Sequence, residues 1–322
     1  MPQNSEQHLE IHRAAQLLHQ GELVAIPTET VYGLAADAKN PAAINKIFAL
    51  KGRPTNHPLI VHISGADQLS HWAVDVPDIA YRLAEQFWPG PLTLILNKRS
   101  DVPSEVTGGQ QTIGLRCPNN ALTLALLTQF DGGLAAPSAN RFGHISPTTA
   151  QHVRDEFGEY APMILDGGAC EVGIESTIVD LCQIPARILR PGQISFTQLQ
   201  PFLDNLQIGA QVNSPRVSGD MASHYAPRTA LRWLNREQML AVAGQQKTVV
   251  LCLDHVPNGL SGLALPNNAD DYAQNLYASL RLLDQQNAEL ILLEHIPQSA
   301  DWLAIIDRLQ RAVVGSGARN NS

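Results

Sequence analysis

Residues 23–34 read LVAIPTETVYGL, a short apolar run followed directly by polar residues and a glycine. The apolar run is typical of a buried strand, and Pro27 ends it because proline has no N–H to donate. Where strands end in an open α/β sheet, polar side chains often line a ligand crevice, so the segment is a candidate site. The alternative is a capped loop, in which Thr28 or Thr30 is an N-cap and Glu29 faces an amide dipole.

Outward from this segment, helical and strand patterns are intermixed. Helices are predicted at 6–19, 41–50, 78–88 and 119–130, and strands at 23–26, 59–63, 92–96, 112–116, 163–165, 176–181 and 187–189. The first helix has an apolar stripe at helical spacing, and Pro41 occupies the first turn of the second, where proline is tolerated. Because the order is not a clean βαβ repeat, we expect an α/β (α+β) fold with an open, mixed and twisted sheet.

The pattern changes near residue 205. Residues 207–228 lack periodicity and are rich in Gly, Ser, Pro and Asn, which indicates a linker. Beyond it, predicted strands at 229–233, 247–253 and 289–293 alternate with predicted helices at 235–243, 269–286 and 300–314, which favours a small parallel βαβαβα unit. The predicted segments are a first domain at 1–204, a linker or lid at 205–228, and a small second domain at 229–322.

The composition excludes several functional classes. The 322 residues carry a net charge of −8, and the pI is near 5.7, whereas an extended nucleic-acid-binding face needs a basic excess. The four cysteines form no CxxC pair, so reduced buried thiols are favoured over a zinc site. The charged N-terminus and the lack of a run of about 18 apolar residues predict a soluble, cytoplasmic protein. Walker A, GxGxxG, HExxH and GxSxG motifs are also absent from the sequence.

A lysine and an arginine follow the second predicted helix, in the order Lys51-Gly52-Arg53-Pro54. Cations suit the C-terminal end of a helix dipole, which explains their charge without any ligand. The glycine between them and the proline after them indicate a tight loop that holds both cations close together. Such a pair suits phosphate oxygens, with arginine as a fork and lysine as a point charge. His62 ends the next apolar run, and a structural role is the alternative to a catalytic one.

Arg116 is flanked by apolar residues in the predicted strand of TIGLRCP, residues 112–118. Arginine is seldom buried alone, so its partner is either an internal carboxylate or a substrate carboxylate or phosphate. A loop of small residues with hydroxyls, AAPSAN at 135–140, is followed by SPT at 146–148. Such a loop lets a ligand approach the backbone and favours anions, and the alternative is a plain turn with an N-cap.

Similar combinations occur further along the chain. Ser176 lies in GIESTI at 173–178 and Arg190 in LRPG at 189–192, beside glycines at the ends of predicted strands. A His-Tyr pair at 224–225 ends the predicted linker and suits a lid over a site. Together these blocks supply arginines, a lysine, a histidine and many hydroxyls, which is the inventory of a site for an anionic, polar substrate.

These blocks, in this order, resemble the YrdC superfamily, and in detail its two-domain threonylcarbamoyl-AMP synthase branch. The resemblance runs from about residue 8 to residue 200 and continues through HYAP at 224–227 into the second domain. It implies an open-sheet catalytic domain with a positively lined cavity and a small Rossmann-like C-terminal domain. It also implies synthesis of threonylcarbamoyladenylate and pyrophosphate from L-threonine, bicarbonate and ATP.

The resemblance also implies roles for individual residues. Threonine contacts fall on Thr30, His62, Arg116, Ala136 and Ser176. ATP contacts fall on Lys51, Arg53, His57, Thr112, Ser138, Ser146, Arg190 and Tyr225. Lys51 and Arg53 are the expected catalytic pair, Arg116 pairs with the threonine carboxylate, and Tyr225 closes over the nucleotide. His57 stands where the family often has asparagine.

The implied chemistry needs no covalent enzyme intermediate. Threonine's amine takes up CO₂ or bicarbonate, the carbamate oxygen attacks the α-phosphate of ATP, and catalysis is positioning and charge neutralisation. Mg²⁺ is expected on the ATP phosphates, and no carboxylate cluster predicts a separate metal site in the protein. The product is expected to feed a complex that modifies the tRNA adenosine next to the anticodon. No membrane partner and no stable nucleic-acid complex are expected.

Three alternatives stay open. The acidic charge balance and the lack of an aromatic–basic stripe argue against an RNA-binding module of the same fold. A carbamoyl-transfer domain of the hydrogenase-maturation type normally carries zinc-finger and acylphosphatase-like modules, for which four dispersed cysteines leave no room. A paralogue of unknown activity lacks the linker and second domain that are predicted here.

Overall fold

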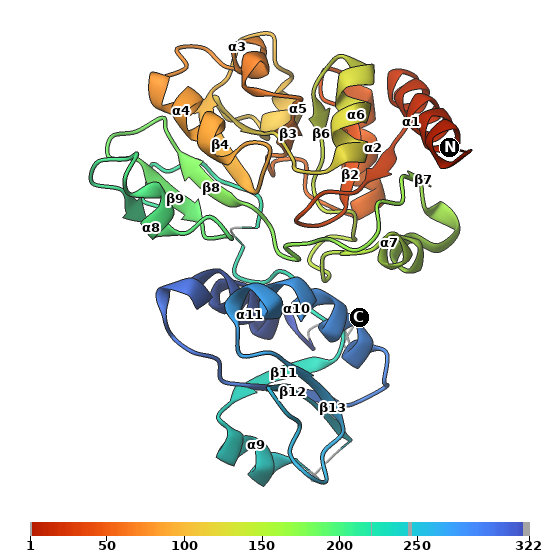
Figure 1. Ribbon diagram of the computed structural model, residues 1–322, viewed down its shortest axis with the longest axis vertical. Coiled ribbons are helices and arrows are strands. Elements are labelled where there is room, and N and C mark those ends of the chain that lie inside the picture. The colour runs from red at the N-terminus through yellow and green to blue at the C-terminus, as the bar shows by residue number, and fades with distance from the viewer. Residues whose placement is uncertain (1, 220, 244–246, 318–322) are drawn as a thin grey trace. The chain divides into compact units, whose positions relative to one another are not determined.

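The computed structural model describes residues 2–219, 221–243 and 247–317, with side chains from residue 6 onward (Figure 1). The chain divides into two compact units. The first comprises Met1–Arg141, Pro147–Glu171 and Glu175–Asp220, and the second comprises Phe142–Ser146, Val172–Ile174 and Met221–Ser322. No helix among the described residues has both the length and the apolar character to cross a bilayer.

The first unit is built on a mixed sheet. Among the described residues it has ten strands, in the order β10-β9-β8-β4-β5-β3-β6-β2-β1-β7. These are β1 (Val24–Ile26), β2 (Gly33–Asp37), β3 (Ile60–His62), β4 (Leu92–Asn97), β5 (Thr112–Arg116), β6 (Leu134–Ala135), β7 (Met163–Ile164), β8 (Thr177–Asp180), β9 (Arg187–Arg190) and β10 (Gln207–Ile208). Parallel and antiparallel neighbours both occur, which confirms the predicted mixed sheet.

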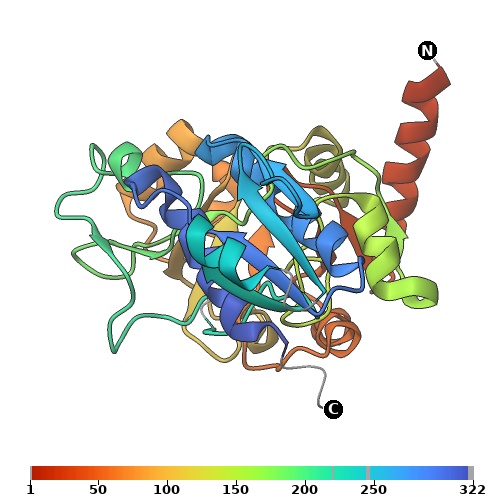
Figure 2. The same cartoon turned by 90° about the horizontal axis from the view of Figure 1, so that it is seen from below.

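Helices cover both faces of this sheet. They are α1 (Pro2–His19), α2 (Pro41–Lys51), α3 (Leu69–Trp72), α4 (Asp78–Phe87), α5 (Ser104–Thr107), α6 (Ala121–Phe130), α7 (Ala150–Phe157) and α8 (Phe196–Leu199), with 3-10 turns η1 (Ala66–Gln68) and η2 (Gly158–Tyr160). Val24 of β1 packs with Leu18 of α1, whereas Ala25 packs in the cluster that contains Ile44 of α2, as strand alternation requires. Figure 2 shows the first turns of α1, in red, extending beyond the sheet.

Local sequence fixes both ends of α2. Asn40 is the N-cap, and its side-chain oxygen accepts two first-turn N–H groups at 3.1 and 3.2 Å. At the other end Gly52 adopts φ +63°, the left-handed conformation that glycine favours after a helix. The N–H of Arg53 then donates to a carbonyl in the last turn at 3.0 Å. The tight loop predicted between Lys51 and Arg53 is confirmed.

The structure corrects the sequence patterns at three strands of the first unit. The patterns predict neither β2 nor β6, although both lie inside the sheet. GLAAD in β2 has weak strand propensity, and its conformation comes from pairing with β1 and β6. The predicted linker was also wrong at Gln207 and Ile208, which form β10 beside β9. Their pairing partners in β9 lie about twenty positions earlier in the sequence, so no local pattern predicts this strand.

The second unit has a parallel sheet in the order β11-β14-β12-β13. Its elements are β11 (Ala230–Leu234), α9 (Arg236–Val242), β12 (Thr248–Leu253), β13 (Gly262–Leu265), α10 (Ala269–Asp284), β14 (Leu290–Glu294), η3 (Ala300–Trp302) and α11 (Leu303–Gly315). Figure 1 shows α10 and α11 on one face and α9 on the other, where Met239 packs with Val250. The predicted small parallel sheet is confirmed, and β13 is an additional strand.

Candidate active site

Lys51 joins two motifs that the sequence shows separately. It ends α2 and is only 3% exposed. Its ammonium donates to the carbonyl oxygens of Ser138 and Asn140, in the small-residue loop after β6. Burial and, second, the charge of Arg53 lower the pKa of Lys51 well below its ordinary value. The lysine therefore holds this loop through its two hydrogen bonds to backbone carbonyls.

Arg53 and Arg190 converge on one residue of the predicted linker, Ser218. Nη2 of Arg53 donates to the Ser218 hydroxyl at 3.2 Å, and Nη1 of Arg190 donates to the Ser218 carbonyl at 2.8 Å. Both arginines are buried, one after α2 and the other at the end of β9. Two guanidinium groups around one short segment form a cationic site suited to phosphate oxygens.

Ser176 is the direct neighbour of this cationic site. Arg190 donates to the Ser176 hydroxyl from Nη2 at 3.1 Å and to the Ser176 carbonyl from Nε at 3.0 Å. The Thr93 hydroxyl lies 2.8 Å from the same Ser176 oxygen. A predicted ATP contact and a predicted threonine contact are thus hydrogen-bonded to each other in the first unit.

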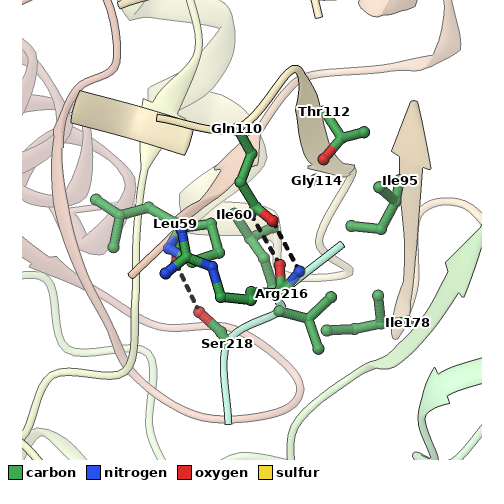
Figure 3. Close-up of a pocket in the computed structure, with 11 residues that line it drawn as sticks. Leu59, Ile60, Ile95, Gln110, Thr112, Gly114, Ile178, Arg216 and Ser218 are labelled. Atoms are coloured by element: carbon green, nitrogen blue, oxygen red, sulfur yellow. Dashed lines mark hydrogen bonds between the residues drawn. The ribbon is translucent and has the colours of Figure 1, made fainter. Parts of the chain in front are cut away.

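Residues 216–218 of the predicted linker lie along the sheet of the first unit. The Gln110 side chain accepts the N–H of Arg216 at 2.8 Å and donates to its carbonyl at 3.0 Å (Figure 3). Val217 packs into a small apolar cluster on the sheet. A pocket of about 10 Å³, the size of one water molecule, remains between this segment and Thr112. The linker therefore shares a pocket with a predicted ATP contact.

Arg116 is paired with an internal carboxylate, one of the two partners that the sequence left open. Its Nη2 lies 2.8 Å from Oε2 of Glu29, and each residue is 4% exposed. The Arg116 Nε also donates to the Gly90 carbonyl at 3.3 Å. Oε2 of Glu29 accepts the N–H of Asn119 at 3.1 Å, just before α6, where a helix dipole favours negative charge. The amide-dipole interpretation of Glu29 is confirmed.

His62 stands beside Arg116. They are register partners in the parallel strands β3 and β5, so their side chains point to the same face of the sheet. His62 is 3% exposed. Burial and, second, the Arg116 charge lower the pKa of His62 from 6.5 to about 3. The imidazole is therefore neutral at physiological pH and offers one donor and one acceptor.

This shift makes the stability of the first unit pH-dependent. Folding favours neutral His62, so its contribution is complete above pH 6.5 and is lost as the pH falls from 6.5 toward 3. At 1.36 kcal/mol per pKa unit, lowering the pH to 5 should cost about 2 kcal/mol through this residue. The variant His62→Asn lacks the titrating group and should lose about 2 kcal/mol less between pH 7.5 and pH 5. Urea unfolding of both proteins at the two pH values measures the difference, and equal losses would contradict the assignment.

The PTETVY segment, residues 27–32, is held by hydrogen bonds of its own hydroxyl groups. The Thr28 oxygen accepts the N–H of Val31 at 3.1 Å and lies 2.8 Å from the Thr30 hydroxyl. The Tyr32 hydroxyl donates to the Gly168 carbonyl at 2.7 Å and accepts the N–H of the preceding glycine at 3.1 Å. The capped-loop interpretation is thus confirmed for Thr28, and the loop presents Glu29 and Thr30 from a fixed turn.

Two other predicted residues lie in loops beside β3. The N–H of Ala136 donates to the Ile60 carbonyl at 3.0 Å, which places the small-residue loop against β3. His57 is half-buried between α2 and β3, and its N–H donates to the Pro54 carbonyl at 3.2 Å. Its contact with ATP stays a prediction.

Ser146 and Tyr225 belong to the second unit. Ser146 is fully buried there. Tyr225 is also buried, with its ring stacked on Tyr277 at 5.7 Å and the guanidinium of Arg308 over it at 5.3 Å. The His224 ring meets Tyr225 nearly edge-on at 4.1 Å. The predicted lid residue is part of an aromatic cluster within this unit, and its role over the nucleotide stays a prediction.

The sequence patterns missed Ser218 and Glu29 as site residues. Glu29 had a usable signal, because it lies in a polar motif and Arg116 was expected to need a carboxylate. Ser218 had none, because nothing in a polar linker indicates that two distant arginines will donate to it. The carbonyls that hold Lys51 also carry no sequence signal, since every residue has one.

Known proteins match the chain over nearly its whole length. A family profile described as telomere recombination matches residues 16–192, and one described as the threonylcarbamoyl-AMP synthase C-terminal domain matches residues 194–313. A threonylcarbamoyl-AMP synthase of Pyrococcus abyssi is 36% identical over 317 residues, which cover 94% of this chain and 93% of the relative. The chain belongs to the threonylcarbamoyl-AMP synthase family.

Other threonylcarbamoyl-AMP synthases agree with this membership. That of Bacillus subtilis is 37% identical over 327 residues, covering 95% of this chain and 93% of the relative. A crystal structure of P. abyssi Sua5 complexed with L-threonine matches with a TM-score of 0.88 and 34% identity, over 95% of this chain and 94% of the other. The family resemblance predicted from the motifs is confirmed, and this member of the threonylcarbamoyl-AMP synthase family is an enzyme.

Proposed function

We propose that the enzyme condenses L-threonine, bicarbonate and ATP to threonylcarbamoyladenylate, pyrophosphate and water, and is therefore a nucleotidyltransferase. The observation that carries the proposal is the hydrogen bond between Arg190 and Ser176, which joins a cationic site to a small polar site. A phosphate-binding site beside a polar site for the amino acid is the arrangement that aminoacyl and carbamoyl adenylation needs. The P. abyssi relative complexed with L-threonine supports the amino acid as substrate.

The proposed reaction has two steps. The amine nitrogen of threonine forms a bond to the carbon of bicarbonate, and water leaves, giving the carbamate. A carbamate oxygen then bonds to the α-phosphorus of ATP, and the bond to the bridging oxygen of the β-phosphate breaks. Arg53 and Arg190 neutralise the phosphate charge that develops. Phosphate oxygens near Lys51 raise its lowered pKa again, so its charge follows the nucleotide.

ATP competes with the linker in this scheme. Ser218 accepts hydrogen bonds from Arg53 and Arg190, the two residues that we assign to the phosphates. Binding of the nucleotide therefore displaces or reorients residues 216–218. We assign the lid role predicted for 205–228 to this short segment, because its backbone is held by reversible hydrogen bonds from the side chains of Gln110 and Arg190.

The nucleotide brings its own metal ion in this proposal. Among the described residues, no group of three or more His, Cys, Asp or Glu side chains is arranged to hold a metal. Mg²⁺ binds well to phosphate oxygens together with water, so it enters as MgATP. The labile product then passes to a complex that modifies the tRNA adenosine next to the anticodon. We also propose that the enzyme acts in the cytoplasm.

Pyrophosphate release tests the proposal. The purified enzyme is incubated with MgATP, and threonine and bicarbonate are each supplied or omitted. Release that requires both additions is the expected result. Release that is indifferent to threonine, or no release at all, contradicts the proposal. In that case salt-sensitive RNA binding is measured next, because an RNA-binding module of the same fold is the alternative function.

A further inference from the structure

One carboxylate oxygen of Glu29 is buried and has no hydrogen-bond partner among the described residues. Its Oε2 is used twice, as acceptor for the N–H of Asn119 and in the ion pair with Arg116. Its Oε1 is also buried, and no hydrogen-bond donor among the described residues reaches it. A buried, unsatisfied acceptor is costly, especially when it is charged, and in a native structure it needs an explanation.

Arg116 and its register partner His62 also have atoms that lack a hydrogen-bond partner in the described part of the chain. Nη2 of Arg116 is 2.8 Å from Oε2, an ion pair by distance, yet it makes no hydrogen bond of good geometry within the described chain. Nδ1 of His62, the register partner of Arg116, is buried without a described partner. A negative acceptor, a positive donor and a neutral imidazole nitrogen thus occur on Glu29, on its ion-pair partner Arg116 and on the register partner of Arg116, His62.

These groups complement an α-amino acid that carries a hydroxyl. Its carboxylate accepts from Arg116, and its hydroxyl bonds to the imidazole of His62. Its ammonium group has three N–H donors and needs an acceptor, which Oε1 of Glu29 supplies. An α-amino acid bears both charges on one carbon, and the Glu29–Arg116 pair likewise brings its two charges within 2.8 Å. The bound ligand then makes charges of opposite sign alternate around the site.

The loop that carries Glu29 is ordered before any ligand arrives. The Thr28 hydroxyl closes a turn by accepting the N–H groups of Thr30 at 3.2 Å and Val31 at 3.1 Å. The Asn119 N–H and Arg116 hold one oxygen of Glu29, which fixes the direction of the other. A preorganised acceptor binds its ligand without a further ordering cost.

We propose that Oε1 of Glu29 binds the ammonium group of the threonine substrate and selects ligands with a free α-amine. This inference rests on the proposed function and adds a residue to the threonine contacts predicted from the sequence. It also gives Glu29 a role in orientation, because the nitrogen that Glu29 holds is the one that, after the ammonium group has lost a proton to water, forms the bond to the carbon of bicarbonate.

The test compares two ligands on three proteins. L-threonine and 3-hydroxybutanoate, which is threonine without its amine, are titrated by ligand-observed NMR into the wild type, Glu29→Gln and Asp180→Asn. Asp180 is a matched control, because it is a buried carboxylate of β8 that accepts from Cys182 and Gln183. Far-UV circular dichroism and thermal unfolding verify that each variant is folded.

The expected result is a loss of ligand discrimination in one variant. Threonine should bind Glu29→Gln about 10- to 100-fold more weakly than the wild type, because a charge-assisted hydrogen bond is lost. The affinity for 3-hydroxybutanoate should stay the same or rise, and Asp180→Asn should resemble the wild type. A purely structural role of Glu29 predicts equal weakening for both ligands, and that result overturns the proposal.

The wild type alone gives a second measurement in case Glu29→Gln does not fold. If it binds 3-hydroxybutanoate as tightly as threonine, the ammonium group contributes nothing and the proposal fails. If it binds threonine but Glu29→Gln shows no loss, only the role of Glu29 fails. If it binds neither ligand and releases no pyrophosphate, the proposed function fails and this inference with it.

Discussion

Replacing Lys51 by methionine is expected to lower the rate of pyrophosphate release by about 10²- to 10³-fold, the effect of removing one preorganised charge from a transition state. The same change should destabilise the first unit by about 2–6 kcal/mol, from two carbonyls at 1–3 kcal/mol each. The carbonyls of Ser138 and Asn140 lose their donor, while methionine keeps the length of the buried stem. Steady-state kinetics and urea unfolding measure the two effects.

Lys46→Met is the matched control for this prediction. Lys46 lies on the same helix, but it is exposed and pairs with Glu22 at 2.7 Å. Such surface pairs contribute about 0–1 kcal/mol, so the control should keep both rate and stability. A Lys51→Met variant that unfolds early but retains full turnover would show that Lys51 only holds the loop. Unchanged stability would show that the two carbonyls find other donors.

Replacing Arg116 by methionine should destabilise the first unit by about 3–5 kcal/mol, because one partner of a buried ion pair is removed. Glu29 would then be left as an uncompensated charge, with only the Asn119 N–H as donor among the contacts described. The KM for threonine should also rise by about 10- to 100-fold through the lost contact with the substrate carboxylate. The KM for ATP should change little, since the phosphates are assigned to other arginines.

A double variant separates the two effects of Arg116. Adding Glu29→Gln to Arg116→Met removes the uncompensated charge, so part of the stability should return while threonine binding does not.

Arg154→Met is the control for Arg116→Met. It removes an exposed arginine that pairs with Asp166 at 3.4 Å, and its effect on stability should be nearly neutral. If Arg116→Met lowers stability but leaves the KM for threonine unchanged, Arg116 is a structural partner of Glu29 and does not bind substrate.

Much of the fold could be predicted because its strongest signals are local. The tight loop after α2 follows from Gly52, whose positive φ is cheap only for glycine. The parallel sheet of the second unit was predicted correctly because most of its strands and helices are long and regular. The short strands β2, β6, β10 and β13 were missed, since segments of only two to five residues show no decisive periodicity.

The candidate site could be predicted as a set of residues but not as an arrangement. The position of Arg116 in an apolar strand predicted that it has a partner, because burying an unpaired guanidinium group has a prohibitive free-energy cost. From the sequence alone, an internal carboxylate and an anionic group of the substrate satisfied that requirement equally well. The tertiary structure decides between them. The PTETVY loop lies against the start of α6, which puts Glu29 beside Arg116, and the register of β3 with β5 places His62 next to Arg116.

The sequence by itself determined the residue types, the capped ends of α2 and the family, because caps, turns and motifs depend on neighbours along the chain. The tertiary structure alone decided which buried charges meet and which polar atoms stay unsatisfied, among them Oε1 of Glu29. It also decided that Ser218 of the linker accepts from two arginines. These contacts join residues from 28 to 165 positions apart. Their energies depend on burial and distance, which exist only once the sheet has formed.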